Sequence, residues 1–156
     1  MTSGNPPAGT TVRDEARYQG VLARRMQWDL LVWQVPVLGM TAQAFLFTIA
    51  LGDGNRFGRI VASLLSLTMT FLCITLMARH RQAELTDARW LAEYERAHFE
   101  DSSVHGADWR QRRDATGLDA GRIGRAIPLL PGFTTWIVGL AAFGGAAIAA
   151  LIHACL

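Results

Sequence analysis

Two long apolar runs, residues 30–51 and 60–77, dominate the hydrophobic pattern of the chain, and a short polar turn separates them. Neither run contains a charged residue, and a third uncharged run covers residues 133–156. At about 1.5 Å per helical residue the first two runs reach about 27–33 Å, which matches a bilayer hydrocarbon core of about 30 Å. The pattern predicts an all-α integral membrane protein with three transmembrane helices, a hairpin followed by a C-terminal span.

The segment before the first run, residues 12–28, predicts a basic amphipathic helix. Tyr18, Leu22 and Met26 recur at helical spacing and give one apolar stripe, while Arg24 and Arg25 are among the arginines that cover the rest. Two alternatives follow. The helix either contacts anionic lipid headgroups through these arginines or packs against a second cytoplasmic helix.

That second helix is predicted as an extension of the second span. No glycine or proline interrupts residues 78–100, so the helix is expected to continue past the membrane. Leu85, Ala88, Leu91 and Ala92 fall on one face of it and form a narrow apolar stripe. A contact with the 12–28 helix and a contact between subunits both fit this stripe.

Weakly polar residues inside the spans are the candidates for helix contacts or for the lining of a path. In the first run Gln34, Thr41 and Thr48 are spaced by sevens on one face, and Gln43 lies off that face. In the second run the corresponding stripe contains Ser63, Ser66 and Thr70, and it continues through Cys73 and Met77. The stripes either hold the hairpin together or line a water-filled path in an oligomer. We expect the Gln43 amide to find a partner in another helix or another subunit.

The third run is rich in small residues. Ala141, Gly145 and Ala149 recur every four residues, and Gly139 precedes them. Rows of this kind let helices approach closely in membranes. We expect the row to pack against the hairpin or against a neighbouring subunit.

Pro36, near the start of the first run, predicts either a break and restart of the helix or a kink.

The distribution of arginine predicts the topology. Four arginines precede the first span, two lie in the turn, nine lie between residues 79 and 125, and none follows the third span. The positive-inside bias therefore places the N-terminus in the cytoplasm and the C-terminus outside the inner (plasma) membrane. Residues 1–11 are expected to be a disordered tail and residues 101–132 a cytoplasmic loop. In that loop Arg110, Arg112 and Arg113 are further candidates for contact with headgroups or a protein partner.

No motif for catalysis, for a cofactor or for a metal site is found in the sequence. There is no P-loop, no Gly-x-Ser-x-Gly and no dinucleotide-binding glycine pattern, and the spans carry no ionisable group of the kind that active transporters use. We expect no enzyme activity, no cofactor and no bound metal. A nucleic-acid partner is disfavoured because the basic segments hold few aromatic residues.

The layout of a basic helix, a tight two-span hairpin and a long cytoplasmic helix, over residues 12–100, resembles bacterial SLATT-type membrane effector domains. The third span departs from that layout. The resemblance implies a bacterial protein that forms homo-oligomers and perturbs or permeabilises the membrane. The alternative is a non-conducting accessory subunit that docks a cytoplasmic or membrane partner.

Overall fold

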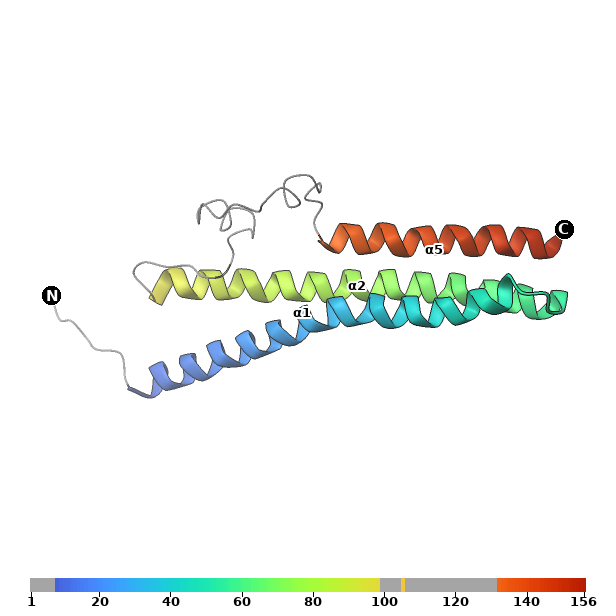
Figure 1. Ribbon diagram of the computed structural model, residues 1–156. Coiled ribbons are helices and arrows are strands. Elements are labelled where there is room, and N and C mark those ends of the chain that lie inside the picture. The colour runs from blue at the N-terminus through green and yellow to red at the C-terminus, as the bar shows by residue number, and fades with distance from the viewer. Residues whose placement is uncertain (1–7, 99–104, 106–131) are drawn as a thin grey trace, which may run out of the picture. The chain divides into compact units, whose positions relative to one another are not determined.

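The computed structural model describes residues 8–98, 105 and 132–156, which form three helices (Figure 1). They are α1 (Ala8–Ala50), α2 (Arg56–His98) and α5 (Gly132–Cys155). Each helix is long and apolar enough to cross a membrane, as judged by length and hydropathy. This confirms the prediction of an all-α chain with three candidate spans.

Helices α1 and α2 are much longer than a membrane crossing. Each has 43 residues and therefore a length of about 65 Å, about twice the hydrocarbon core of a bilayer. The described residues accordingly fall into two compact units. We call residues 30–81 and 132–156 the membrane unit. Residues 12–29 and 82–98, with His105, are the extramembrane unit.

Several boundaries differ from the sequence-based prediction. Helix α1 starts at Ala8, so four residues of the predicted tail are helical, and residues 1–7 lie outside the described residues. The helix also runs without a break through Pro36, whose side chain is buried, and the predicted restart does not occur. Helix α5 begins at Gly132, one residue early. Apart from Gly132 and His105, the predicted loop 101–132 lies outside the described residues.

The turn between α1 and α2 fixes one end of the membrane unit. Asn55 caps α2, because its side-chain Oδ1 accepts a hydrogen bond from the Gly58 backbone N–H at 2.6 Å. Two arginines of the first turn of α2 then reach the ends of the other helices. Arg59 Nε donates to the Ala50 carbonyl at 3.2 Å, and the Arg56 guanidinium donates to the Cys155 carbonyl.

These contacts explain why two arginines sit at the N-terminus of a helix, where its own dipole disfavours them. The last carbonyls of α1 and α5 have no partner within their helices, and the negative ends of both dipoles lie at the same place. The arginines satisfy these carbonyls and neutralise that charge. The contact of Arg56 with Cys155 also places the end of α5 beside the start of α2, so α5 runs parallel to α1.

The core of the membrane unit is small and depends on close approach of the helices. Its main cluster consists of Val32, Cys73, Met77 and Leu140. A Cβ atom at Gly39 would lie 2.4 Å from the Cys73 Sγ, and one at Gly144 would lie 3.0 Å from the Thr70 Cγ2. Both glycines therefore allow a helix separation that a larger residue would prevent.

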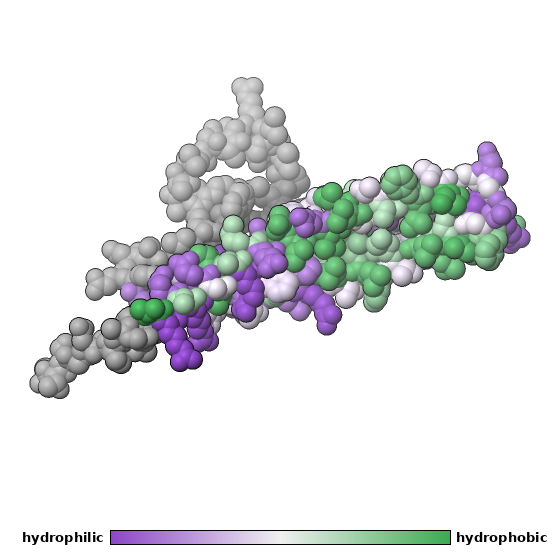
Figure 2. Space-filling model, turned by 90° about the horizontal axis from the view of Figure 1, so that it is seen from below, coloured by the Kyte–Doolittle hydropathy of each residue, from purple (hydrophilic) through white to green (hydrophobic). Residues whose placement is uncertain are grey.

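The surface of the membrane unit is apolar. Large hydrophobic side chains are exposed on all three helices, among them Leu38, Phe45, Phe71 and Val138. The face of the membrane unit in Figure 2 is largely green, the colour of hydrophobic residues. Contiguous apolar surface of this kind is typical of contact with lipid or with other membrane helices.

Candidate functional sites

A small polar core lies inside the membrane unit. Gln43, Ser63, Ser66 and Thr70 are buried between the helices. The Gln43 Nε2 donates to the Thr70 Oγ1 at 2.8 Å, and the Thr70 hydroxyl donates to the Ser66 carbonyl at 3.0 Å. The Ser63 hydroxyl donates to the Arg59 carbonyl at 2.9 Å. The amide of Gln43 thus finds a partner in another helix of the same chain.

Two atoms of this polar core have no hydrogen-bond partner among the described residues, the Gln43 Oε1 and the Ser66 Oγ. A buried polar atom without a partner costs about 1–3 kcal/mol. The hydrogen-bonding groups of the polar core are therefore only partly paired, and the unpaired Oε1 reduces the net contribution of Gln43 to the stability of the fold. All four side chains are buried, and the Gln43–Thr70 hydrogen bond joins α1 to α2 as the hairpin-packing alternative expects, whereas the other hydrogen bonds of this core lie within α2. Their role as lining residues in an oligomer stays a prediction.

The other polar stripe of the first span faces outward. Gln34, Thr41 and Thr48 are all exposed in the single chain. The two threonine hydroxyls donate to carbonyls of their own helix, of Val37 at 2.9 Å and of Phe45 at 2.7 Å. Among the described residues the Gln34 amide makes no hydrogen bond to a carbonyl of its own helix. We call the face of α1 that carries these three residues the α1 stripe.

The small-residue row of α5 does not face the hairpin, which was one of its two expected contacts. The residues that α5 buries are Leu140, Gly144, Ala147, Ala150 and Ala154. The predicted row shares none of these positions, and at about 100° per residue its middle, Gly145, lies nearly opposite Ala147 and Ala154 on the helix. Ala141, Gly145 and Ala149 are exposed, and no atom lies within 4 Å of a Cβ built at Gly139 or Gly145. The row therefore does not pack against the hairpin, and its contact with another subunit stays a prediction.

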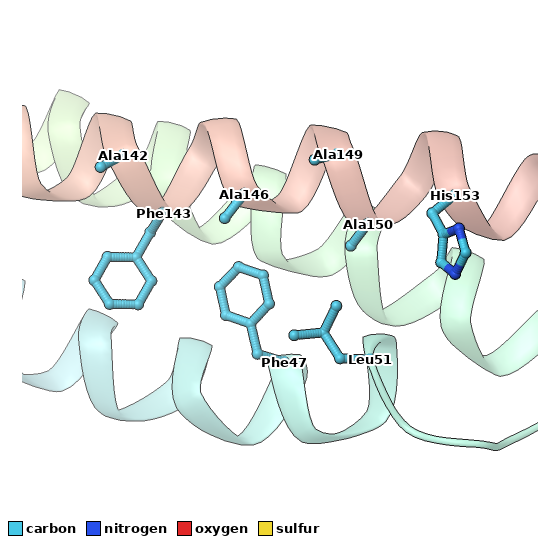
Figure 3. A pocket seen from close by; sticks show the side chains of 8 residues that line it. All are labelled: Phe47, Leu51, Ala142, Phe143, Ala146, Ala149, Ala150 and His153. Atoms are coloured by element: carbon cyan, nitrogen blue, oxygen red, sulfur yellow. The ribbon is translucent and has the colours of Figure 1, made fainter.

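An open apolar groove of about 640 Å³ runs between the end of α1 and the second half of α5 (Figure 3). Phe47 and Leu51 line it from α1, and Figure 3 shows both side chains pointing toward α5. The lining from α5 consists of Ala142, Phe143, Ala146, Ala149, Ala150 and His153. The groove is wide because four of these residues are alanines.

In the extramembrane unit, arginines of α1 pair with buried acids of α2. Arg24 makes a bidentate contact with Asp87 at 2.9 and 2.6 Å, and Arg25 lies 3.4 Å from Glu84. The two carboxylates are almost fully buried, whereas the Arg24 side chain is about half exposed. Arg24 and Arg25 thus hold the two helices together, as the helix-packing alternative expects. Their contact with lipid headgroups stays a prediction.

A third buried acid, Glu95, is the centre of a hydrogen-bond cluster. Its carboxylate accepts hydrogen bonds from the Tyr18 hydroxyl at 2.9 Å and from the His105 backbone N–H at 2.9 Å, and it also contacts the His105 ring. Burial by itself raises the pKa of Glu95. The bonds from His105 and Tyr18 favour the charged form more strongly, and the pKa lies below its ordinary value.

An aromatic ladder lies beside Glu95 on α2. Tyr94 stacks on His98 with ring centroids 4.0 Å apart and on Trp90 at 5.4 Å, and the Tyr18 ring of α1 lies 5.2 Å from Tyr94. The Arg17 guanidinium lies over Trp90, 5.2 Å from the ring centre. Aromatic and cation–π contacts thus extend the pairing of the two helices beyond the ion pairs.

The apolar stripes predicted from the sequence include Tyr18 but not the buried acids of this helix pair, and two of their residues lie elsewhere. Leu85 and Met26, both predicted to face a partner, are exposed. The buried face of α2 instead combines Ala88, Leu91 and Ala92 with the acids Glu84, Asp87 and Glu95. The signal was present in the spacing, because the three acids share the helical register of Leu91. A search restricted to apolar residues does not detect it.

The remaining candidates give no site. Arg110, Arg112 and Arg113 lie outside the described residues. Within the described parts of the chain, no group of three or more histidine, cysteine or acidic residues could hold a metal ion. Comparisons with protein-family models, with curated proteins and with solved structures found no match to this chain.

Proposed function

We propose that the protein is a self-associating multi-pass membrane protein whose copies contact one another through the α1 stripe. The observation that carries the proposal is the exposure of Gln34, Thr41 and Thr48 on a helix long and apolar enough to span the membrane. A polar side chain that faces lipid is unfavourable, and an amide has the most to gain from a partner in another helix. A second copy supplies such a partner.

The spacing of the stripe supports a helix–helix contact rather than isolated polar positions. A repeat of seven residues keeps one face of a helix against a neighbour in a left-handed pair. The exposed apolar residues Val37, Leu38 and Phe45 lie between the polar ones on the same face. The face thus offers both apolar packing and a hydrogen-bonding amide to a second copy.

Conduction is the further part of this proposal. In a ring of copies, those polar groups of the α1 stripe that are not used in the contact between neighbouring helices would line a water-filled path. This would be the membrane-perturbing activity that the SLATT-like layout implies.

The second candidate, a non-conducting accessory subunit, is favoured by a different observation. Four of the seven polar candidates are buried inside one chain, which leaves only three to line a path.

Native mass spectrometry from lipid nanodiscs tests the proposal by counting copies in the assembly. We expect a discrete oligomer for the wild-type protein. Cross-linking then locates the contact. In a Cys155→Ser background, Thr41→Cys should form disulfide-linked dimers in membranes, whereas the control Val138→Cys, exposed on α5, should not. A monomer by mass, or equal cross-linking at both positions, would refute self-association through α1.

Ion flux into liposomes separates the conducting from the accessory form. A ring of four or more copies that conducts, with flux altered by Thr41→Val, supports the pore. Thr41→Val keeps the shape of the side chain and removes only the hydroxyl. A defined oligomer that shows no flux supports the accessory subunit.

A further inference from the structure

The apolar groove between α1 and α5 is separate from the α1 stripe, because its lining from α1 consists of Phe47 and Leu51. Its position within the membrane unit is informative. From Ala142 to His153 the groove follows α5 over about 17 Å, about half of a hydrocarbon core of about 30 Å. The groove therefore has the depth of one leaflet and ends where α1 ends.

An imidazole lines one end of the groove and a guanidinium binds α5 near that end, whereas the other lining residues are apolar. His153 borders the groove in the last turn of α5 (Figure 3). Arg56 is exposed and bound to the carbonyl of Cys155, two residues further along α5. A guanidinium has five N–H donors, so this contact leaves others for a second acceptor. Two other charged residues lie in or next to this turn. Asp53 is acidic, and Arg59 already donates a hydrogen bond to the Ala50 carbonyl.

We propose that this groove binds one acyl chain of an anionic phospholipid, with the phosphate of that lipid at Arg56 and His153. Three features of the groove match this one ligand. The walls are apolar, the length is that of a single leaflet, and positive charge is placed at the end where the headgroup lies. A helix from a second copy would use the apolar walls but would have no need for the basic end.

One variant of the protein tests the binding of the acyl chain, and another tests the binding of the headgroup. Ala146→Phe places a ring inside the groove and removes the space for the acyl chain. Ile148→Phe is the matched control, because Ile148 lies two residues away on the same helix, is exposed and does not line the groove. Arg56→Gln removes the charge at the headgroup end and keeps a donor for the Cys155 carbonyl.

The measurement is native mass spectrometry of the purified protein after exposure to equal amounts of phosphatidylglycerol and phosphatidylcholine in detergent micelles. We expect the wild type and Ile148→Phe to retain one lipid per chain, with at least a threefold preference for phosphatidylglycerol. Ala146→Phe should reduce the retained fraction at least fivefold. Arg56→Gln should retain lipid without the preference. Far-UV circular dichroism checks that each variant is helical, and Ala149→Phe replaces Ala146→Phe if that variant does not fold.

The proposal is overturned if the wild type retains no lipid, or if the groove-filling variant retains as much as the Ile148→Phe control. It is also overturned if Ala146→Phe changes the number of copies in the assembly and leaves lipid retention unchanged, because the groove is then a contact between copies. Lipid adducts and subunit number are resolved in the same spectrum. Failure of this proposal is therefore distinguishable from failure of self-association through α1.

Discussion

The contact between Gln43 and Thr70 gives the sharpest test of the membrane unit, because the sign of its effect depends on which partner is removed. Thr70→Val removes the hydroxyl and leaves the Gln43 Nε2 buried without an acceptor. Stranding a buried donor costs about 1–3 kcal/mol. We expect the free energy of unfolding to fall by that amount in an otherwise wild-type chain.

Gln43→Leu should behave differently. It gives up one interhelical hydrogen bond, worth about 0.6–1.7 kcal/mol in a membrane, and also removes the Oε1 that already lacks a partner. Removing this buried oxygen without a partner should return about 1–3 kcal/mol of stability. The variant should therefore be as stable as the wild type or more stable by about 1 kcal/mol. In the Gln43→Leu background, Thr70→Val should then cost less than about 0.5 kcal/mol, because no donor is stranded.

The assay is reversible unfolding of the four proteins of this cycle in mixed micelles with increasing SDS, followed by far-UV circular dichroism. The four proteins are the wild type, the two single variants and the double variant. If Thr70→Val costs the same with Gln43 and with leucine at position 43, the two side chains are not coupled. That result would refute the account of a buried, partly satisfied polar core.

Three further predictions concern the other contacts of the fold. Gly39→Ala places a Cβ 2.4 Å from the Cys73 Sγ and should destabilise the membrane unit by about 1–3 kcal/mol, and Cys73→Ala in the same chain should restore most of the loss, as measured by the same SDS unfolding. Arg24→Ala leaves the buried Asp87 carboxylate without its guanidinium and should cost about 1–2 kcal/mol, seen as faster hydrogen exchange in the extramembrane unit. Because the folded-state pKa of Glu95 is lowered, its contribution to stability should be complete above about pH 4.5 and lost as the pH falls through the folded pKa, as thermal melts against pH would show.

Each of these has a matched control. Gly145→Ala meets open space and should be neutral, and a loss as large as that of Gly39→Ala would contradict the close-approach argument. Arg13→Ala, on the exposed surface of α1, should leave hydrogen exchange unchanged, and an equal effect there would mean that net charge rather than the ion pair matters. Glu95→Gln should remove the acid dependence. The exposed Glu93→Gln should keep it, and the idea fails if both variants behave alike.

The sequence by itself determined the number of candidate spans, which is three. An uninterrupted apolar run of about 20 residues has no polar face to offer water, so runs such as 60–77 predict membrane helices without any knowledge of their neighbours. The long extension of α2 was also predictable, because residues 78–98 contain no glycine or proline that would favour an end of the helix. These features depend on local composition.

Only the tertiary structure decided which face of each helix is inside. The sequence places Gln34 and Gln43 on different faces of one apolar run, but only the structure shows that Gln43 is buried against Thr70 and that Gln34 is exposed. The sequence favours the row through Gly145 for close packing, yet Gly144 is the glycine that meets Thr70. Rotation of a helix about its axis is set by the fit of side chains on its neighbours, and periodicity within one helix does not by itself determine that fit.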